Sequence, residues 1–164
     1  MKLHNLVYKK TARLLMAAGL DIILKDTSRP WGGFYVIDEA QAEKFVKYFF
    51  PGEDFEKLQV SGKLSPKILM VAPGKRLSWQ YHFRRSEIWR CIEGEVAVVT
   101  SISDEMKEKH HLNPGDQISL KQGERHRLIG LDGWGVIAEI WLHTDAKHPS
   151  DEDDIVRLQD DFGR

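Results

Sequence analysis

Residues 73–96, "PGKRLSWQYHFRRSEIWRCIEGEV", decide the fold because they place polar side chains within runs that are otherwise typical of β-strands. Two apolar and aromatic runs are separated by "RRS" and closed by "EG", which predicts successive antiparallel strands. Gln80 and His82 are two residues apart and face one side of a strand, with Glu87 on the next strand. An imidazole, a carboxylate and an amide oxygen that converge inside a small β-barrel suit a divalent metal.

A fourth ligand is expected in the segment "NPGDQISLKQGERHRLIG", residues 113–130. His126 follows a glycine-containing turn there and begins a strand. We therefore predict a metal site formed by Gln80, His82, Glu87 and His126.

From Ser65 onward the chain consists of short β-type runs separated by turn residues. Examples are "KILMVA", "EVAVVTSI" and "GVIAEIWLH", with "PGK", "NPGD" and "DGWG" among the separators. About eight closely spaced strands without helices between them predict an antiparallel sandwich or barrel.

The first third of the chain has helical patterns. Residues 1–28 predict an amphipathic helix whose apolar run is too short to span a bilayer. A second helical pattern, with an acidic start, covers residues 38–58 and is interrupted by Pro51 and Gly52. We expect an N-terminal helical extension over 1–28 and a β domain over 29–164.

The amino-acid composition indicates which binding partners and which cellular compartment to expect. The chain has 164 residues, enough for one domain with a core, and acidic and basic residues nearly balance at a net charge of -1. This balance argues against a nucleic-acid partner. Because Cys91 is the single cysteine, no disulfide is expected within the chain. We expect a cytoplasmic protein without a membrane partner.

Several other polar residues are not spaced from one another in a way that predicts a metal site or a catalytic site. We expect His4, His143 and His148 to be exposed, and the acidic run "DEDD" (151–154) to form a solvated helical turn. The five tryptophans are expected to pack mainly in the core.

Two spaced motifs resemble those of the cupins. Gly74, Gln80, His82, Glu87 and Gly94 follow the spacing of the first cupin motif, with glutamine at its first histidine position. The second motif is matched by Gly115, Lys121, Gly123, His126 and Gly130. "RPWGGFYVIDE", "GERHRLIG" and "DEDDIVRLQDDFGR" narrow the resemblance to the type II mannose-6-phosphate isomerase domain, often found at the C-terminus of mannose-1-phosphate guanylyltransferases.

The resemblance implies a cupin jelly-roll barrel that interconverts an aldose phosphate and its ketose phosphate, with mannose 6-phosphate and fructose 6-phosphate as the expected pair. It implies a bound divalent metal, usually zinc, with iron, manganese or cobalt as alternatives. Three family histidines are replaced here by Phe83, Arg84 and Ile88. These replacements put the substrate, and the groups that move protons, in question.

The resemblance also suggests residues that contact the substrate. Arg85, Arg127 and Arg164 match family arginines and are expected, with Arg29, to bind the phosphate, because a guanidinium fork suits a dianion. The reaction also needs a general base within hydrogen-bond reach of the migrating proton. The candidates near the barrel mouth are Lys121, Glu139 and Arg84.

Two other functions remain open at this point. One is a cupin oxygenase that uses non-haem iron, because the fold alone does not define the chemistry. The other is a sugar-phosphate-binding module without turnover. Phosphorylated aldoses other than mannose 6-phosphate, such as heptose phosphates, remain possible substrates. A homodimer that pairs through sheet edges is expected.

Overall fold

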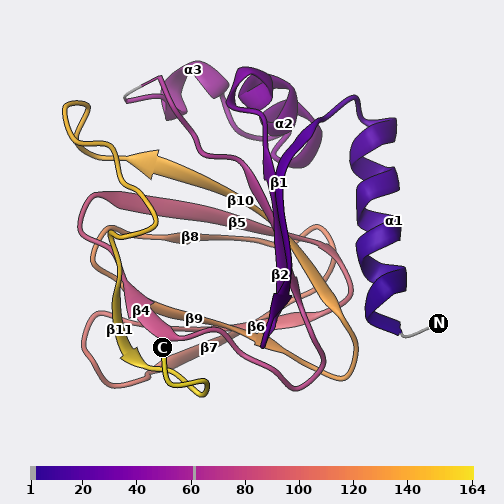
Figure 1. Cartoon of the computed structure of the whole chain (residues 1–164). Helices are drawn as coiled ribbons and strands as arrows, with labels where there is room; N and C mark the ends of the chain where they lie inside the picture. Colours follow the sequence, from indigo (N-terminus) through magenta and orange to yellow (C-terminus); the bar gives the residue numbers. More distant parts are fainter. Residues whose placement is uncertain (1–2, 61) are drawn as a thin grey trace.

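Two antiparallel sheets form the body of the protein in a computed structural model that describes residues 3–60 and 62–164, with side chains from Leu6 onward (Figure 1). The first sheet has the order β1-β2-β3-β10-β5-β8. Its strands are β1 (Ile22–Arg29), β2 (Gly32–Ile37), β3 (Lys67–Val71), β10 (Gly135–His143), β5 (Arg85–Glu93) and β8 (Gln117–Leu120). The second has the order β11-β4-β9-β6-β7. Its strands are β11 (Val156–Gln159), β4 (Trp79–Tyr81), β9 (Arg125–Gly130), β6 (Val96–Ser101) and β7 (Glu108–Leu112).

The helices lie on the outer side of the first sheet, away from the second (Figure 1). They are α1 (Leu3–Ala17), α2 (Ala42–Phe49) and α3 (Phe55–Leu58), with the 3-10 turn η1 (Glu39–Gln41) before α2. The helical pattern over 38–58 is thus confirmed as two pieces. Among the described residues, no helix is long and apolar enough to cross a membrane.

The prediction of a helical extension over residues 1–28 is wrong for residues 22–28, which are part of a strand. Gly19, with a φ of 73°, ends α1 through hydrogen bonds from Gly19 N to Met16 O and from Leu20 N to Leu15 O. Residues 22–29 then form β1, which pairs with β2. A boundary between residues 28 and 29 therefore falls inside a hairpin of the first sheet.

Strict alternation along the central strands gives the first sheet two buried faces. Ile68 and Met70 of β3 pack under the helices with Phe45, whereas Leu69 and Val71 pack between the sheets. The helices cover one face and the second sheet covers the other, so β3 is buried throughout. The same alternation turns the odd-numbered residues of β5 and β10 toward the space between the sheets.

The C-terminal strand β11 was not predicted from the sequence. Its residues pair with β4, with Arg157 opposite Gln80. The preceding acidic run forms a turn whose residues Asp151, Glu152 and Asp153 are exposed, as expected, but Asp154 is only 3% exposed. Its carboxylate accepts hydrogen bonds from the backbone N–H groups of Phe83 and Arg84. The run therefore closes the barrel end beside the polar residues of β4 and β5.

Candidate metal centre

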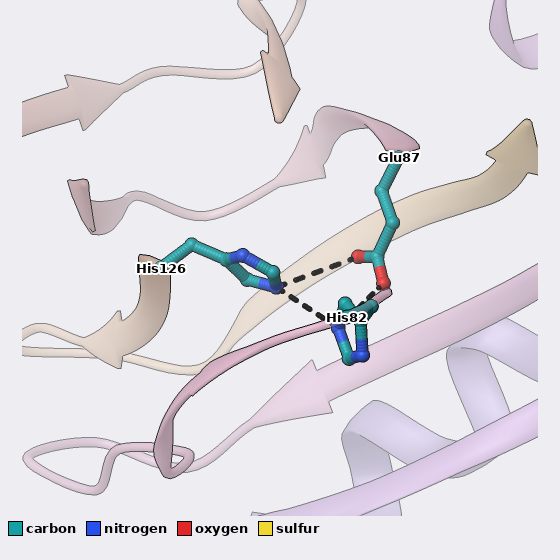
Figure 2. Close-up of side chains that lie close together, drawn as sticks. All are labelled: His82, Glu87 and His126. Atoms are coloured by element: carbon teal, nitrogen blue, oxygen red, sulfur yellow. Dashed lines mark hydrogen bonds and ion pairs between the residues drawn. The ribbon is translucent and has the colours of Figure 1, made fainter. Parts of the chain in front are cut away.

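Three buried side chains from two distant segments meet between the sheets (Figure 2). His82 follows β4, Glu87 lies on β5 and His126 lies on β9; one ligand atom from each lies within 4.8 Å of the others. His82 Nε2 is 3.1 Å from Glu87 Oε1 and 3.3 Å from His126 Nε2. Each of the three residues is at most 3% exposed. We call these residues the triad.

Hydrogen bonds define which ring nitrogen of each histidine carries a proton. His82 Nδ1 lies 2.7 Å from the Asp154 carbonyl oxygen, and His126 Nδ1 lies 3.0 Å from the Glu124 carbonyl oxygen. Because a carbonyl oxygen can only accept, both Nδ1 atoms donate. Both Nε2 atoms are therefore turned toward each other and toward Glu87, an arrangement that a shared proton or a metal cation would stabilise.

The charges within the triad favour a neutral His126 and an ionised Glu87. Burial lowers the pKa of His126 to about 4, although Glu87 acts in the opposite direction. Burial opposes ionisation of Glu87, but Arg85 and His82 outweigh it and hold its pKa well below the usual range. Two imidazoles that present Nε2 and one carboxylate match the ligand preferences of zinc and similar divalent ions, so these residues fit the implied metal.

Arg85 provides a positive charge beside the triad. Its Nε donates to Glu87 Oε1 at 2.8 Å, and its Nη2 lies 3.2 Å from His82 Nε2. Its Nη1 donates to Ser150 Oγ at 2.8 Å, and the guanidinium lies 3.6 Å from the Trp141 ring centroid. Arg85 was expected to bind phosphate; in this structure its donors hold triad atoms and the loop before β11.

Glu139 is a second buried carboxyl group in the same cavity. Its oxygens accept hydrogen bonds from Trp141 Nε1 at 2.9 Å and Trp89 Nε1 at 2.7 Å. Trp89 Nε1 also donates to Glu87 Oε2 at 2.9 Å, so one indole links the two carboxyl groups. Burial, together with the charge of Glu87, raises the pKa of Glu139 to about 8. Trp89 and Trp141 are therefore more than buried packing residues, because their indole N–H groups orient carboxyl groups of the site.

Gln80, the fourth predicted ligand, lines the same cavity and pairs across strands with His126. Its amide Nε2 donates to the Ser78 carbonyl oxygen at 3.4 Å. With the nitrogen so engaged, the amide oxygen is the atom left for a ligand role. That role stays a prediction.

Of the other predicted site residues, Arg29 and Arg164 reach the cavity, but each already has an acidic partner. Arg29 Nε is 2.8 Å from Asp26 Oδ2, and Arg164 Nε is 2.8 Å from Asp160 Oδ2. The lining also includes Lys67 and Arg157, which the sequence analysis missed.

Three predicted site residues lie outside the cavity. Lys121 is exposed on the turn between β8 and β9. Arg84 points to the outer surface, where it lies 3.6 Å from Asp151 Oδ2. Arg127 is fully buried, but its guanidinium donates to Leu77 O and to Gln159 Oε1 and O, so it holds β11 against β9. We therefore withdraw the catalytic roles of Lys121 and Arg84 and the phosphate role of Arg127.

The departures from the family pattern also lie outside the cavity. Phe83 is 57% exposed, Arg84 faces the surface, and Ile88 packs in the core beneath the helices. Their replacement therefore removes no group from the cavity that contains the triad.

His143 is a further correction, because it is 1% exposed. Its Nδ1 accepts from Ser150 N at 2.9 Å, and its Nε2 lies 3.1 Å from Ser65 Oγ. His148 is exposed as predicted, with 77% of its side chain accessible, and the His4 side chain lies outside the described residues. The alternation of Glu139, Trp141 and His143 along β10 is the signal that could have placed His143 on the inner face.

Solved structures identify the fold. CapF from Staphylococcus aureus matches 83% of this chain and 34% of its own, with a TM-score of 0.58 and 13% identity. Oxalate oxidase matches 81% of this chain and 58% of its own, with a TM-score of 0.54 and 19% identity. At such identities the likeness concerns the fold alone. The protein is thus a cupin with a jelly-roll barrel, as predicted.

The sequence places this cupin in a family. Residues 38–160 match the family described as "Mannose-6-phosphate isomerase C-terminal", and the chain belongs to it. A mannose-1-phosphate guanylyltransferase of Sinorhizobium fredii is 31% identical over 81% of this chain and 20% of its own length. The alginate biosynthesis protein AlgA of Pseudomonas aeruginosa is 24% identical over 99% of this chain and 32% of its own. The chain thus spans between a fifth and a third of these relatives.

Proposed function

We propose that the protein is a metal-dependent aldose–ketose isomerase acting on a sugar phosphate, with mannose 6-phosphate and fructose 6-phosphate as the pair. The observation that carries the proposal is the triad, whose two Nε2 lone pairs and carboxylate face one another inside a cavity. Family membership supports the reaction class. A divalent ion held by His82, Glu87 and His126 would supply Lewis acidity at the oxygens of substrate C1 and C2.

Glu139 is the residue we assign to the proton transfer. The reaction requires one proton to leave C2 of the aldose and one to return to C1, while a hydroxyl proton moves from O2 to O1. Glu139 lines the cavity beside the triad, and its two indole donors hold the carboxyl group in one orientation. Burial keeps Glu139 protonated up to about pH 8 without a metal, and the positive charge of a bound cation would favour its ionised form. In that form each carboxylate oxygen has a second lone pair that can accept the substrate proton.

Arg85 and Asp154 have positioning roles in this proposal. Arg85 orients Glu87 through the 2.8 Å contact with Oε1. Asp154 fixes the His82 ring through its carbonyl oxygen and fixes the chain after His82 through its carboxylate. The Asp154 carboxylate also accepts a hydrogen bond from Ser150 Oγ at 2.6 Å, and the same hydroxyl accepts one from Arg85 Nη1. Arg85 and Asp154 therefore belong to one hydrogen-bond network.

The test is conversion of mannose 6-phosphate by metal-loaded protein, followed by proton NMR in deuterated water. We expect fructose 6-phosphate to form, activity to stop with a chelator, and zinc or another divalent ion to restore it. His126→Ala should be inactive, whereas His111→Ala, at an exposed histidine paired with Glu95, should retain activity. Metal-loaded protein that binds mannose 6-phosphate without conversion or proton exchange would instead be a binding module.

A further inference from the structure

The lining of the cavity is predominantly basic. Its basic side chains are those of Arg29, Lys67, Arg85, Arg157 and Arg164, and its acidic side chains are those of Glu87, Glu139 and Glu152. Two of the acidic groups lie deep, at 5% exposure or less, whereas Glu152 and Arg157 are exposed at the solvent side, which we call the cavity mouth. The mouth thus attracts anions, while the deep end contains the triad.

Lys67 is a buried ammonium group with an exposed counter-ion. Its side chain is only 8% exposed, and within the described part of the chain its one ion pair is with Glu152 Oε1 at 2.7 Å, whose side chain is 73% exposed. The Lys67 ammonium lies 5.0 Å from the Phe34 ring and 4.9 Å from the Trp141 ring. A buried charge needs a partner, but a solvated carboxylate is readily exchanged for a better one.

Arg157 faces the cavity from the opposite sheet. It lies on β11 directly opposite Gln80, whereas Lys67 lies on β3 directly opposite Glu139. Directly opposed residues of antiparallel strands have side chains on the same face, so both cations flank cavity residues. Among the described residues, the structure gives the Arg157 guanidinium no hydrogen bond and no ion pair. Its donors are thus available to a ligand.

We propose that Lys67 and Arg157 form the subsite for the substrate phosphate, and that Glu152 occupies this subsite until the phosphate displaces it. The other cations are already committed, because Arg85 holds Glu87, Arg29 holds Asp26 and Arg164 holds Asp160. An ammonium and a guanidinium suit the charge and the oxygen geometry of a phosphate dianion.

This subsite defines the substrate class more closely. A phosphate at the mouth and a carbonyl at the deep triad require the two groups to lie at opposite ends of the sugar. The substrate is therefore an aldose phosphorylated on its terminal carbon. This statement of substrate rests on the proposed isomerase function, whereas the phosphate subsite itself can be tested by binding alone.

The experiment is calorimetric titration of the metal-loaded full chain with inorganic phosphate, repeated after metal removal so that binding to the metal is separated from binding at the mouth. We expect Arg157→Gln and Lys67→Gln each to weaken binding by at least about tenfold, the loss of one charged hydrogen bond. Lys67→Arg should bind within a few fold of the original, which also controls for folding at this buried position. Lys109→Gln, which removes a positive charge from exposed β7, is the matched control and should bind as the original does.

The substitution Glu152→Gln is expected to change phosphate affinity in the opposite direction. Removal of the competing carboxylate should tighten phosphate binding in both metal states, which a purely structural role for Lys67 does not predict. The inference is overturned if the original chain binds no phosphate, if Arg157→Gln binds as tightly as the original, or if Glu152→Gln weakens binding. Because no turnover is measured, phosphate binding through these residues in a protein that fails to isomerise would reject the proposed function and leave the subsite standing.

Discussion

His82 and His126 direct their Nε2 atoms at each other across 3.3 Å, while both Nδ1 atoms donate to backbone carbonyl oxygens. The two Nε2 atoms therefore face each other in a buried site beside a carboxylate. A shared positive charge stabilises this arrangement, and in this structure Arg85 provides part of that charge. The relationship between the two rings explains why the cavity fits a divalent metal.

Glu139→Gln is expected to lower the isomerisation rate by about 100- to 10,000-fold, the usual contribution of a positioned acid or base. The amide keeps the shape of the side chain but cannot take the C2 proton. The measurement is the initial rate with mannose 6-phosphate, together with metal content, which should remain at the original value. A variant with full activity would remove Glu139 from the proton transfer.

The contribution of Glu139 to the stability of the metal-free protein should fall as pH rises from about 4.5 to about 8, because Glu139 retains its proton in the folded state, with a pKa of about 8, and loses it in the unfolded chain near 4.5. In this window the unfolded state binds fewer protons at this group, so Glu139 reduces the free energy of unfolding by about 1.4 kcal/mol per pH unit. Burial lowers the pKa of His126 and of His143 to about 4, so these two groups act in the opposite direction up to about pH 6.5, and the Glu139 contribution is the difference between the original chain and Glu139→Gln. Urea denaturation at several pH values measures the slope. Glu139→Gln should remove this contribution, and an unchanged slope in the variant would contradict the assignment.

Arg85→Met is expected to destabilise the metal-free protein by about 3–5 kcal/mol, because it leaves the buried Glu87 carboxylate without its cation. Saturating zinc should restore part of the loss, because the metal supplies positive charge to the same carboxylate. Arg84→Met, which removes only a partly exposed arginine, should cost no more than about 1 kcal/mol. Equal losses for the two variants in urea denaturation would contradict this role of Arg85.

The pH dependence that Glu87 contributes has the opposite sign to that of Glu139. Its pKa is depressed in the folded state, so its stabilising contribution is present above the unfolded value near 4.5 and is lost as pH falls below it. Glu87→Gln should flatten the acid limb of the stability curve. An acid limb in the variant as steep as in the original chain would show that other carboxylates cause it.

Arg127→Met is expected to loosen the C-terminal strand without affecting the metal. The guanidinium donates hydrogen bonds to Leu77 and Gln159. The loss of each of these charged hydrogen bonds should lower the free energy of unfolding by up to about 3 kcal/mol. Limited proteolysis should cleave the variant near β11 sooner than the original chain. Arg76→Met is the control, because Arg76 forms only an exposed pair with Asp161. Unchanged protection at β11 would contradict the structural role of Arg127.

The features that sequence reasoning found are those with a local signal. Alternation and turn residues predicted the strands from β3 to β10, and the cupin spacing predicted that His82, Glu87 and His126 come together. Two of these three ligands are close in the sequence, with His82 just after β4 and Glu87 on β5, and the third follows a distinctive glycine turn. The remaining metal ligand, Gln80, stays a prediction.

The features that were missed depend on contacts between distant segments. Lys67 begins an apolar strand and resembles an ordinary strand end, yet its partner Glu152 lies 85 residues away. Arg157 belongs to a short strand recognised only through pairing with β4, and Arg127 differs from a ligand-binding arginine only through its contacts with Gln159. Period-two alternation on β5 and β10 did contain a signal for Arg85 and His143, because both share the inner face of their strand with glutamate and tryptophan.

The most direct test of the central claim is calorimetric titration of the chelator-treated, metal-free protein with zinc, with the fold of each variant checked by circular dichroism. The account predicts one equivalent of metal per chain and loss of this site in His82→Ala, Glu87→Gln and His126→Ala, with binding retained in His111→Ala. No metal binding by the original chain, or undiminished binding by His126→Ala, would contradict it.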